Sequence, residues 1–244
     1  MKPARFAKRG GKADSFPPLS LVAFKNTSRL IPSKYSIPDE SVLAKIAPNQ
    51  EVLETAFELD NKTNDRLLAE QDLLPGIGPH EMVFGIPYAS IINAAFTHAR
   101  PDGARFSGPD RGAWYAGRTV HVSQAEVAYH QAVALSEVGV FEDEVTYDEY
   151  LADFNGEFHD LRRASRFSAC LDPSSYIASQ TLAEQLLENG SLGVVYPSVR
   201  RARGTCLACL DPKSVLNVRK ARRFHFIWRG NPAPKIIPSN PEAP

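Results

Sequence analysis

Apolar and polar positions along the chain predict helices in the first half and strands weighted to the second. The predicted helices cover Glu51–Leu59, Tyr88–Phe96, a segment from Thr119 or Ser123 to about Glu137, and Ala178–Glu188. In the first of these, Leu53, Ala56 and Phe57 have the spacing of one helix face. The third has two candidate N-caps, Thr119 and Ser123, and the pattern does not choose between them.

The predicted strands are short and lie mostly late in the sequence. They are Ala113–Ala116, Glu157–Leu161, Gly193–Tyr196, Thr205–Leu210 and Phe224–Trp228. This distribution favours an α/β protein of the α+β kind, with a helical N-terminal half and a strand-rich C-terminal half. Neither a Walker loop nor a Rossmann fingerprint is found, because Gly76-Ile-Gly78 follows Pro75 and no strand leads into it.

The middle of the chain has no internal repeat and no clear linker, which favours a single domain. Residues 1–18 are rich in Lys, Arg, Gly and Pro and are expected to form a flexible basic arm. Residues 231–244 contain repeated prolines and are expected to form a tail. The domain between them is expected to span residues 19–230.

Composition argues against several classes of protein. The chain has 28 basic and 28 acidic residues, whereas a dedicated nucleic-acid binder usually carries a basic excess. No stretch approaches the roughly 20 apolar residues of a membrane span, and the basic start lacks the apolar core of a signal peptide. Three cysteines without a disulfide pattern fit a reducing compartment. We therefore expect a cytoplasmic protein that binds neither nucleic acid nor membrane.

Charged residues nevertheless cluster in two places. The acidic cluster comprises Glu142, Asp143, Glu144, Asp148 and Glu149, and residues 200–223 are rich in Arg and Lys. Such clusters are most often solvated faces, and that interpretation is favoured over a partner-binding role.

Glu126 is the residue that its neighbours explain least. On a helix it shares a stripe with Val122, Tyr129 and Val133. A carboxylate on such a stripe is costly unless it is paired or used. If the helix begins at Ser123, then Ser123 and Glu126 form a capping box. If it begins near Thr119, that explanation fails, and the sequence leaves both starts open.

Three further residues are candidates for the same site. Arg105 lies in the turn Gly103–Gly108, where a guanidinium can grip a phosphate or carboxylate. Tyr115 and Trp114 are neighbours on a predicted strand, so their side chains point to opposite faces. One ring can therefore face the core while the other faces a ligand. Ser198 follows a predicted strand without a Gly-x-Ser-x-Gly elbow, which favours a hydrogen-bonding role over covalent catalysis. Taken singly, each residue also fits an ordinary structural role.

Other motifs carry less weight. Cys206-Leu-Ala-Cys209 has redox-motif spacing, but residues three apart on a strand face opposite sides. The six histidines include no His-x-x-x-His pair, and no metal site is assigned. His130 is interpreted as an ordinary polar residue on a helix face, and a position of Tyr129 and His130 at the border of the site is the alternative.

The order and spacing of these segments resemble the RES domain, the toxin component of bacterial RES–Xre toxin–antitoxin pairs. The matching segments are Ser28–Tyr35, Phe96–His98, Gly103–Ser107, Trp114–Ala116, Ala125–His130 and Gly193–Arg200, followed by Cys206–Leu210. The resemblance spans about residues 20–230 and implies a single domain with a fold like that of ADP-ribosyltransferase catalytic domains. The matched family residues are Arg29 and Arg105 as the arginines, Tyr115 as the site tyrosine, Glu126 as the glutamate and Ser198 as the serine. Ser107 stands where many compact members carry asparagine, and the segment between the two arginines is longer than theirs.

The resemblance also implies an activity that destroys NAD. Members release nicotinamide by hydrolysis or phosphorolysis, so NAD is the substrate, phosphate is a candidate co-substrate and no cofactor is required. Glu126 would hold the ribose and stabilise positive charge on its reacting carbon. Arg105, together with Arg29, would neutralise the pyrophosphate or an attacking phosphate. Tyr115 would stack on nicotinamide or shape its pocket, and Ser198 would hydrogen-bond the dinucleotide.

Three functions are weighed at this point. The leading one is an NAD-degrading toxin neutralised by a co-encoded, Xre-like helix-turn-helix antitoxin. Within the toxin–antitoxin complex, several copies of this chain could form a homo-oligomer. In the second, the acceptor is a protein side chain, and the chain is an ADP-ribosyltransferase. The third is a catalytically inactive module that binds a partner through one of its charged clusters, although an inactive domain need not keep all four site residues.

Overall fold

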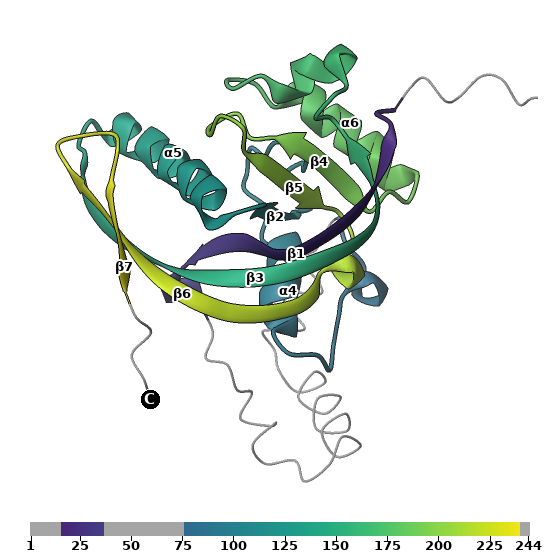
Figure 1. The fold of residues 1–244 in the computed structure, drawn as a ribbon, viewed down its shortest axis with the longest axis horizontal. Helices are drawn as coiled ribbons and strands as arrows, with labels where there is room; N and C mark the ends of the chain where they lie inside the picture. The colour runs from purple at the N-terminus through teal and green to yellow at the C-terminus, as the bar shows by residue number, and fades with distance from the viewer. Residues whose placement is uncertain (1–15, 37–75, 240–244) are drawn as a thin grey trace, which may run out of the picture.

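The structure, a computed structural model, describes residues 16–36 and 76–239 (Figure 1). The predicted helix Glu51–Leu59 and residues 1–15 of the predicted arm lie outside this part of the chain. Within it, the strands are β1 (Leu19–Pro32), β2 (Trp114–Gly117), β3 (Glu142–Asp160), β4 (Gly193–Pro197), β5 (Thr205–Cys209), β6 (Leu216–Arg229) and β7 (Lys235–Ser239). The α-helices are α4 (Ala89–Thr97), α5 (Val120–Val138) and α6 (Ile177–Glu188). Short 3₁₀ helices cover Ser33–Tyr35, Pro79–Glu81, Ser165–Leu171 and Pro212–Ser214.

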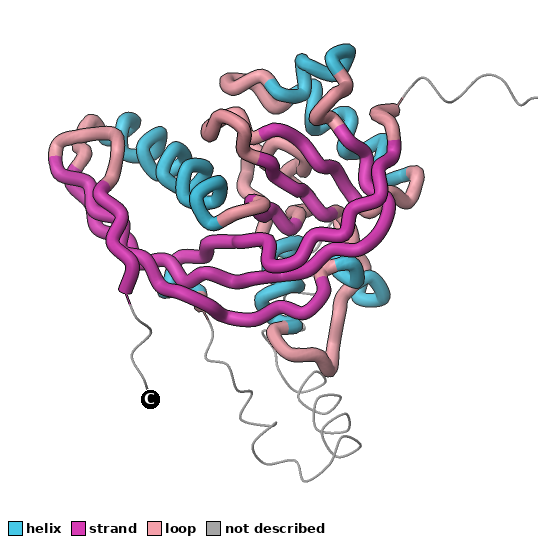
Figure 2. The backbone as a smooth tube through the Cα atoms, viewed as in Figure 1, coloured by secondary structure: helices cyan, strands magenta, loops and turns pink. Residues whose placement is uncertain are grey.

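The seven described strands form one sheet in the order β1-β2-β5-β4-β3-β6-β7. Because β1 also pairs with β3, the strands β1, β2, β5, β4 and β3 close into a ring. Among the described strands, only β3 and β4 pair in parallel, through His159 and Asp160 opposite Val194 and Val195. Strands β6 and β7 extend the sheet beyond the ring (Figure 2).

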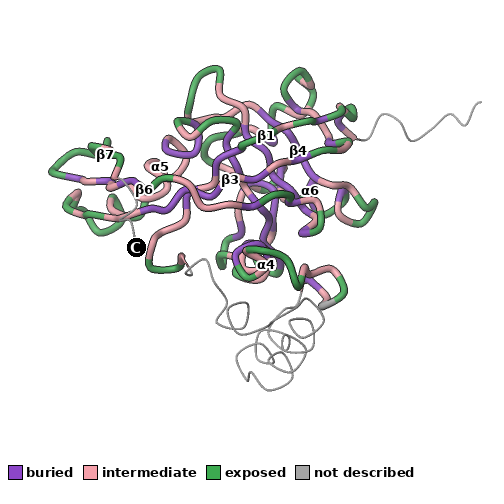
Figure 3. The backbone as a smooth tube through the Cα atoms, turned by 60° about the horizontal axis from the view of Figure 1, so that its bottom comes forward, coloured by how far each residue is buried: buried purple, intermediate pink, exposed green. Residues whose placement is uncertain are grey.

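The three helices pack on different parts of this sheet. Helix α4 buries Ile92 and Phe96 in a cluster with Trp114 and Tyr150, and α6 buries Leu182 and Leu186 beside Val194 and Tyr196. Helix α5 packs Val127 and Leu135 against Phe226 and Trp228 of β6. Helices α5 and α6 lie on the same side of β1 and β3 in Figure 1. Buried backbone is concentrated around β1, β3 and β4 (Figure 3). None of the described helices has the length and apolar character needed to cross a membrane.

The mixed α/β class is confirmed, but the helical N-terminal half is not. The longest element described in that half is β1, which the sequence pattern did not predict. Its register shifts between Phe24 and Thr27, where Asn26 has a positive φ of 57°. A bulge of this kind breaks the period-two alternation by which a strand is recognised. Lys235–Ser239, inside the predicted tail, form β7 and pair with β6.

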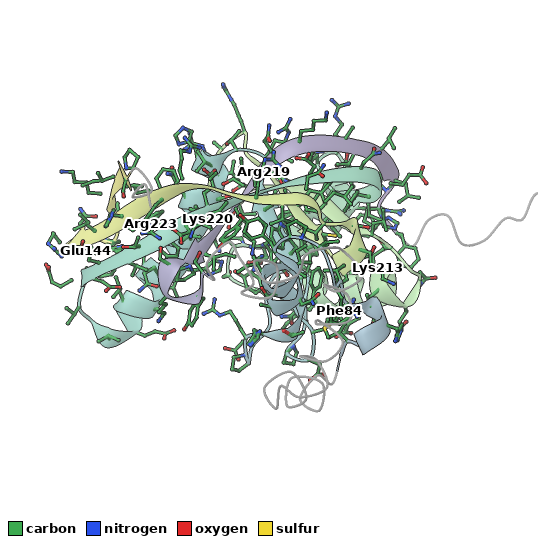
Figure 4. All side chains as sticks on the ribbon, turned by 90° about the horizontal axis from the view of Figure 1, so that it is seen from below. Phe84, Glu144, Lys213, Arg219, Lys220 and Arg223 are labelled. Atoms are coloured by element: carbon green, nitrogen blue, oxygen red, sulfur yellow. The ribbon has the colours of Figure 1, made fainter. Side chains whose placement is uncertain are left out.

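The interpretation of the two charged clusters as solvated faces is wrong at their centre. Asp148 and Glu149 on β3 are buried, with 0% and 1% of their surface exposed. Arg223 of β6 donates to Asp148 at 2.6 Å, and Arg222 donates to Glu149 at 2.9 Å. Lys220 forms a second ion pair with Asp148 at 3.0 Å, and Figure 4 shows it along β6 with Arg223. The acidic and basic segments therefore neutralise each other across two neighbouring strands.

Lowering the pH is expected to destabilise the protein through Asp148. Burial alone would raise the pKa of this carboxyl, but hydrogen bonds from Arg223, Ser36 and Lys220 outweigh it and hold the pKa well below the usual value. A depressed pKa contributes stability that is present above the unfolded-state pKa of about 3.9 and is lost as pH falls through the folded-state pKa. We expect the free energy of unfolding, measured with urea, to fall as pH drops below about 5.

Replacing Asp148 should remove part of this pH dependence. Asp148→Asn is expected to be less stable than the wild type at pH 7, because it removes the buried carboxylate that pairs with the half-buried cations of Lys220 and Arg223. It should also show a flatter decline of stability in acid. Glu157→Gln, an exposed position on the same strand, is the control. An Asp148→Asn protein with the wild-type acid profile would contradict the assignment.

Candidate active site

The start of α5 determines how Glu126 is interpreted. The helix begins directly after Thr119, so Ser123 lies in its first turn and is not the cap. The Ser123 hydroxyl donates to the Ser28 carbonyl at 2.6 Å and accepts from the Gly117 amide at 3.1 Å. The capping-box alternative is therefore excluded. Glu126 is a half-buried carboxylate within the helix.

Ser198 is one hydrogen-bond donor to this carboxylate. Its Oγ lies one residue beyond β4 and donates to Oε1 of Glu126 at 2.7 Å. The same Oγ accepts from the backbone amides of Arg200 and Arg201 at 3.2 and 3.0 Å. Its lone pairs are thus occupied, and its proton is directed at Glu126. Ser198 donates a hydrogen bond to a side chain of the protein, and its hydrogen bond to the dinucleotide stays a prediction.

Arg105 is held rigidly although it comes from a loop. Only 6% of its surface is exposed. Its Nη1 donates to the carbonyls of Cys170 and Asp172 at 3.1 and 2.8 Å. The guanidinium lies over the ring of Tyr176, 4.8 Å from its centroid. These contacts fix the direction of the positive charge before any ligand arrives.

Tyr115 supports the loop that carries Arg105. Its hydroxyl donates to Oγ of Ser107 at 3.0 Å and accepts from the backbone amide of Phe106 at 3.1 Å. Burial raises the pKa of Tyr115 to about 12, so the phenol keeps its proton. Gln180 of α6 donates to the carbonyls of Asp102 and Ala104 in the same loop. Ser107 thus has a defined contact, while stacking of Tyr115 on nicotinamide stays a prediction.

The structure does not bring Arg29 to this group. Arg29 pairs with Tyr150 across β1 and β3, and its guanidinium lies 4.9 Å from the ring centroid of Trp114. Trp114 and Tyr150 belong to the α4 cluster, whereas Tyr115 packs with the α6 cluster on the other face of β2. Directly paired residues share a face of a sheet, which places Arg29 behind Tyr115. Among the described residues, its guanidinium donates to the Tyr115 carbonyl, at 3.3 Å, and burial lowers its pKa to about 10.

Tyr196 of β4 lies among the other candidates. It is 6% exposed and packs edge-on against Phe106 of the Arg105 loop, with ring centroids 4.8 Å apart. Its pKa is raised well above the usual value, first by burial and then by the neighbouring charges of Cys206, Glu126 and Tyr115, while Arg105 lowers it. Arg105, Tyr115 and Glu126 are therefore all near enough to Tyr196 to act on its buried phenol.

His130 and Arg200 extend the site, and sequence reasoning gave them little weight. His130 lies one turn after Glu126 on α5. Arg200 places its guanidinium 3.4 Å from the ring centroid of Tyr129 and donates to the Pro173 carbonyl at 2.6 Å. Burial lowers the pKa of His130 to about 4, and the charges of Arg100, Arg200 and Arg105 contribute. The residues that contact or act on His130 and Arg200 come from four segments: the loop at 100–105, α5, Pro173 and the turn at Arg200. No local pattern could therefore have predicted that they lie together.

We expect His130 to be uncharged at neutral pH. Arg200→Gln should raise its pKa part of the way from about 4 toward the usual 6.5, because one repelling charge is removed while burial remains. An NMR titration of the ring protons measures this change. Arg229→Gln, at the far end of β6, is the control and should leave His130 unaffected. An unchanged pKa in Arg200→Gln would show that the guanidinium does not act on this imidazole.

The arrangement combines a fixed carboxylate with positive charge on arginines. Among the described residues, no carboxylate forms an ion pair with Arg100, Arg105 or Arg200. Such a site can stabilise a cationic centre with the carboxylate and an anionic group with the guanidiniums. In the part of the chain that the structure describes, no group of three or more His, Cys, Asp or Glu side chains could hold a metal ion.

Comparison with protein families identifies the domain. The family model of the RES domain matches residues 82–229, more than half of the chain. This chain belongs to the RES domain family. The match includes Arg105, Tyr115, Glu126 and Ser198, whereas Arg29 and the rest of β1 precede it.

The RES domain of this chain has no match among curated proteins. One similar solved structure is the crystal structure of the Mycobacterium tuberculosis (M.tuberculosis) MbcT–MbcA toxin–antitoxin complex. It shares 15% sequence identity over 52% of this chain and 74% of that chain, with a TM-score of 0.41.

Proposed function

We propose that this chain is the toxin of a toxin–antitoxin pair and that it degrades NAD by cleaving the bond between nicotinamide and ribose. Membership of the RES domain family supports the toxin role. The observation that carries the chemistry is the Glu126 carboxylate, which Ser198 holds at 2.7 Å. Arg105 and Tyr115, like Glu126, are near enough to the buried phenol of Tyr196 to influence its pKa.

The proposed reaction needs charge of both signs. When the nicotinamide–ribose bond breaks, its electron pair moves to the nicotinamide nitrogen and positive charge builds up on the ribose carbon, as in glycoside hydrolysis. A fixed carboxylate lowers the barrier by stabilising that charge, and we assign this role to Glu126. Arg105 would bind the pyrophosphate. An oxygen of water or phosphate then forms the new bond to the ribose carbon. Water loses a proton to solvent in this step, whereas an anionic phosphate oxygen attacks without losing one.

The direct test is to incubate the purified protein with NAD, with and without inorganic phosphate, and to identify the products by mass spectrometry. Free nicotinamide with ADP-ribose indicates hydrolysis, and nicotinamide with phosphorylated ADP-ribose indicates phosphorolysis. NAD that carries label on its adenylate would leave label on protein only if the chain were an ADP-ribosyltransferase. Unchanged NAD in every arm would contradict the proposal.

The toxin role also predicts a protein antitoxin, and an Xre-like helix-turn-helix protein is the partner that the family resemblance favours. The gene next to this one is the first candidate for its source. Co-expression of that neighbour should restore growth and the cellular NAD pool in cells that produce this chain. Growth arrest without any loss of NAD would support a toxin of a different kind.

A further inference from the structure

Two side chains, not one, donate to the same oxygen of Glu126. Oε1 accepts from Oγ of Ser198 at 2.7 Å and from Sγ of Cys206 at 3.6 Å, a normal distance for a thiol donor. No described residue donates to Oε2 of this carboxylate. The described residues therefore bind the carboxylate through Oε1 and provide no hydrogen-bond donor to Oε2.

Cys206 is placed to act as a donor. It is the second residue of β5, paired with Gly117 of β2 on one side and Tyr196 of β4 on the other. Only 3% of its surface is exposed. Burial, followed by the charge of Glu126, raises the pKa of this thiol, so the sulfur keeps the proton that the carboxylate accepts. A nucleophilic or redox role would require the thiolate, which this environment opposes.

We propose that Cys206 is a positioning residue that, together with Ser198, fixes the Glu126 carboxylate so that Oε2 is left for the substrate; this inference rests on the proposed NAD chemistry. The terminal torsion of a glutamate side chain is broad, so a single donor leaves the carboxylate free to turn about that contact. Donors from two different segments, the turn after β4 and strand β5, restrict its plane. Electrostatic catalysis depends on such fixed charges, because they need no reorganisation when the reaction occurs.

The alternative role for the buried Cys206 is ordinary core packing. A second buried cysteine on the same strand serves as a comparison. Cys209 lies three residues further along β5 and is fully buried, on the face that packs with Trp114. Its Sγ donates to the Asp211 carbonyl at 3.1 Å and has no contact with Glu126. Cys209→Ala therefore removes a buried thiol from the same strand without altering the carboxylate.

Infrared spectroscopy of the S–H stretch tests the contact without any substrate. The difference between wild type and Cys206→Ala identifies the band of this thiol. A thiol that donates to a carboxylate absorbs at lower frequency than one that donates to a neutral amide, so the band should move to higher frequency in Glu126→Gln. A Cys206 band at the same frequency in wild type and Glu126→Gln would overturn the inference.

Kinetics test the consequence of the contact. Cys206→Ala should lower kcat for NAD about three- to tenfold with little change in KM, because the buried thiol affects the carboxylate and not substrate binding. Cys206→Ser, which restores a donor, should recover most of this loss, and Cys209→Ala should keep the wild-type kcat. Thermal melts of all three variants establish that the folded proteins are compared.

The two proposals fail in different ways. If wild-type protein consumes no NAD, the proposed function fails, and the S–H band still decides whether Cys206 donates to Glu126. If NAD is consumed and Cys206→Ala keeps the wild-type kcat, the positioning role is overturned while the proposed function stands. The same conclusion follows if Cys209→Ala loses as much kcat as Cys206→Ala, since both would then act through packing.

Discussion

Replacing Glu126 with glutamine is expected to lower kcat for NAD consumption at least about 100-fold, equivalent to roughly 2.7 kcal/mol of transition-state stabilisation. The amide has the shape of the carboxylate, and its oxygen can still accept from Ser198 and Cys206. Folding should therefore be preserved. What is lost is the negative charge that stabilises the cationic ribose carbon. The measurement is release of nicotinamide from NAD at saturating substrate.

Glu137→Gln is the matched control for this experiment. Glu137 lies on the same helix but is exposed and close to its C-terminal end. The substitution removes the same charge from α5, but at a position far from Ser198. We expect wild-type kcat in this variant. Equal activity of wild type and Glu126→Gln would remove Glu126 from the chemistry and with it the central argument of the proposed function.

Local patterns in the sequence predict the elements whose apolar residues follow a simple pattern along the chain. Helices α4 and α6 and strands β4 and β5 were predicted to within one or two residues, because the helices have apolar residues at helical spacing and the strands are short continuous apolar runs. Strand β3 was predicted only at its end, from Glu157. Its first half contains Asp148 and Glu149, whose buried charges are compensated by Arg223 and Arg222 of β6. That compensation comes from 73 to 75 residues away and is invisible in a local window.

The candidate site shows the same limit. Helix periodicity identified Glu126 as unexplained, but its partner Ser198 lies 72 residues further along the chain. The Cys206 motif was discounted as a redox pair, and the structure gives the first of its two thiols a contact that the spacing alone could not predict. Arg29 was grouped with Arg105 by the order of family segments. The register of β1 against β3 instead places it on the other face of the sheet.

Replacing Arg105 with lysine should be nearly as damaging as removing the charge of Glu126. Its Nη1 is committed to the carbonyls of Cys170 and Asp172, which leaves the rest of the fork to face an anion. A lysine ammonium cannot satisfy both carbonyls and bind a phosphate in the same geometry. We expect kcat/KM for NAD to fall about 100-fold, mainly through KM, because the pyrophosphate is bound in the ground state as well as in the transition state.

Arg118→Lys controls for the loss of a guanidinium as such. Arg118 also donates Nη1 to a backbone carbonyl, that of Lys25 at 3.1 Å, and lies 4.9 Å from the ring centroid of Phe24. It therefore has the same kinds of contact as Arg105 but lies at the exposed end of β2. We expect wild-type kinetics in this variant. A drop in kcat with unchanged KM in Arg105→Lys would instead place this arginine at the reacting centre, where it would act only on the transition state.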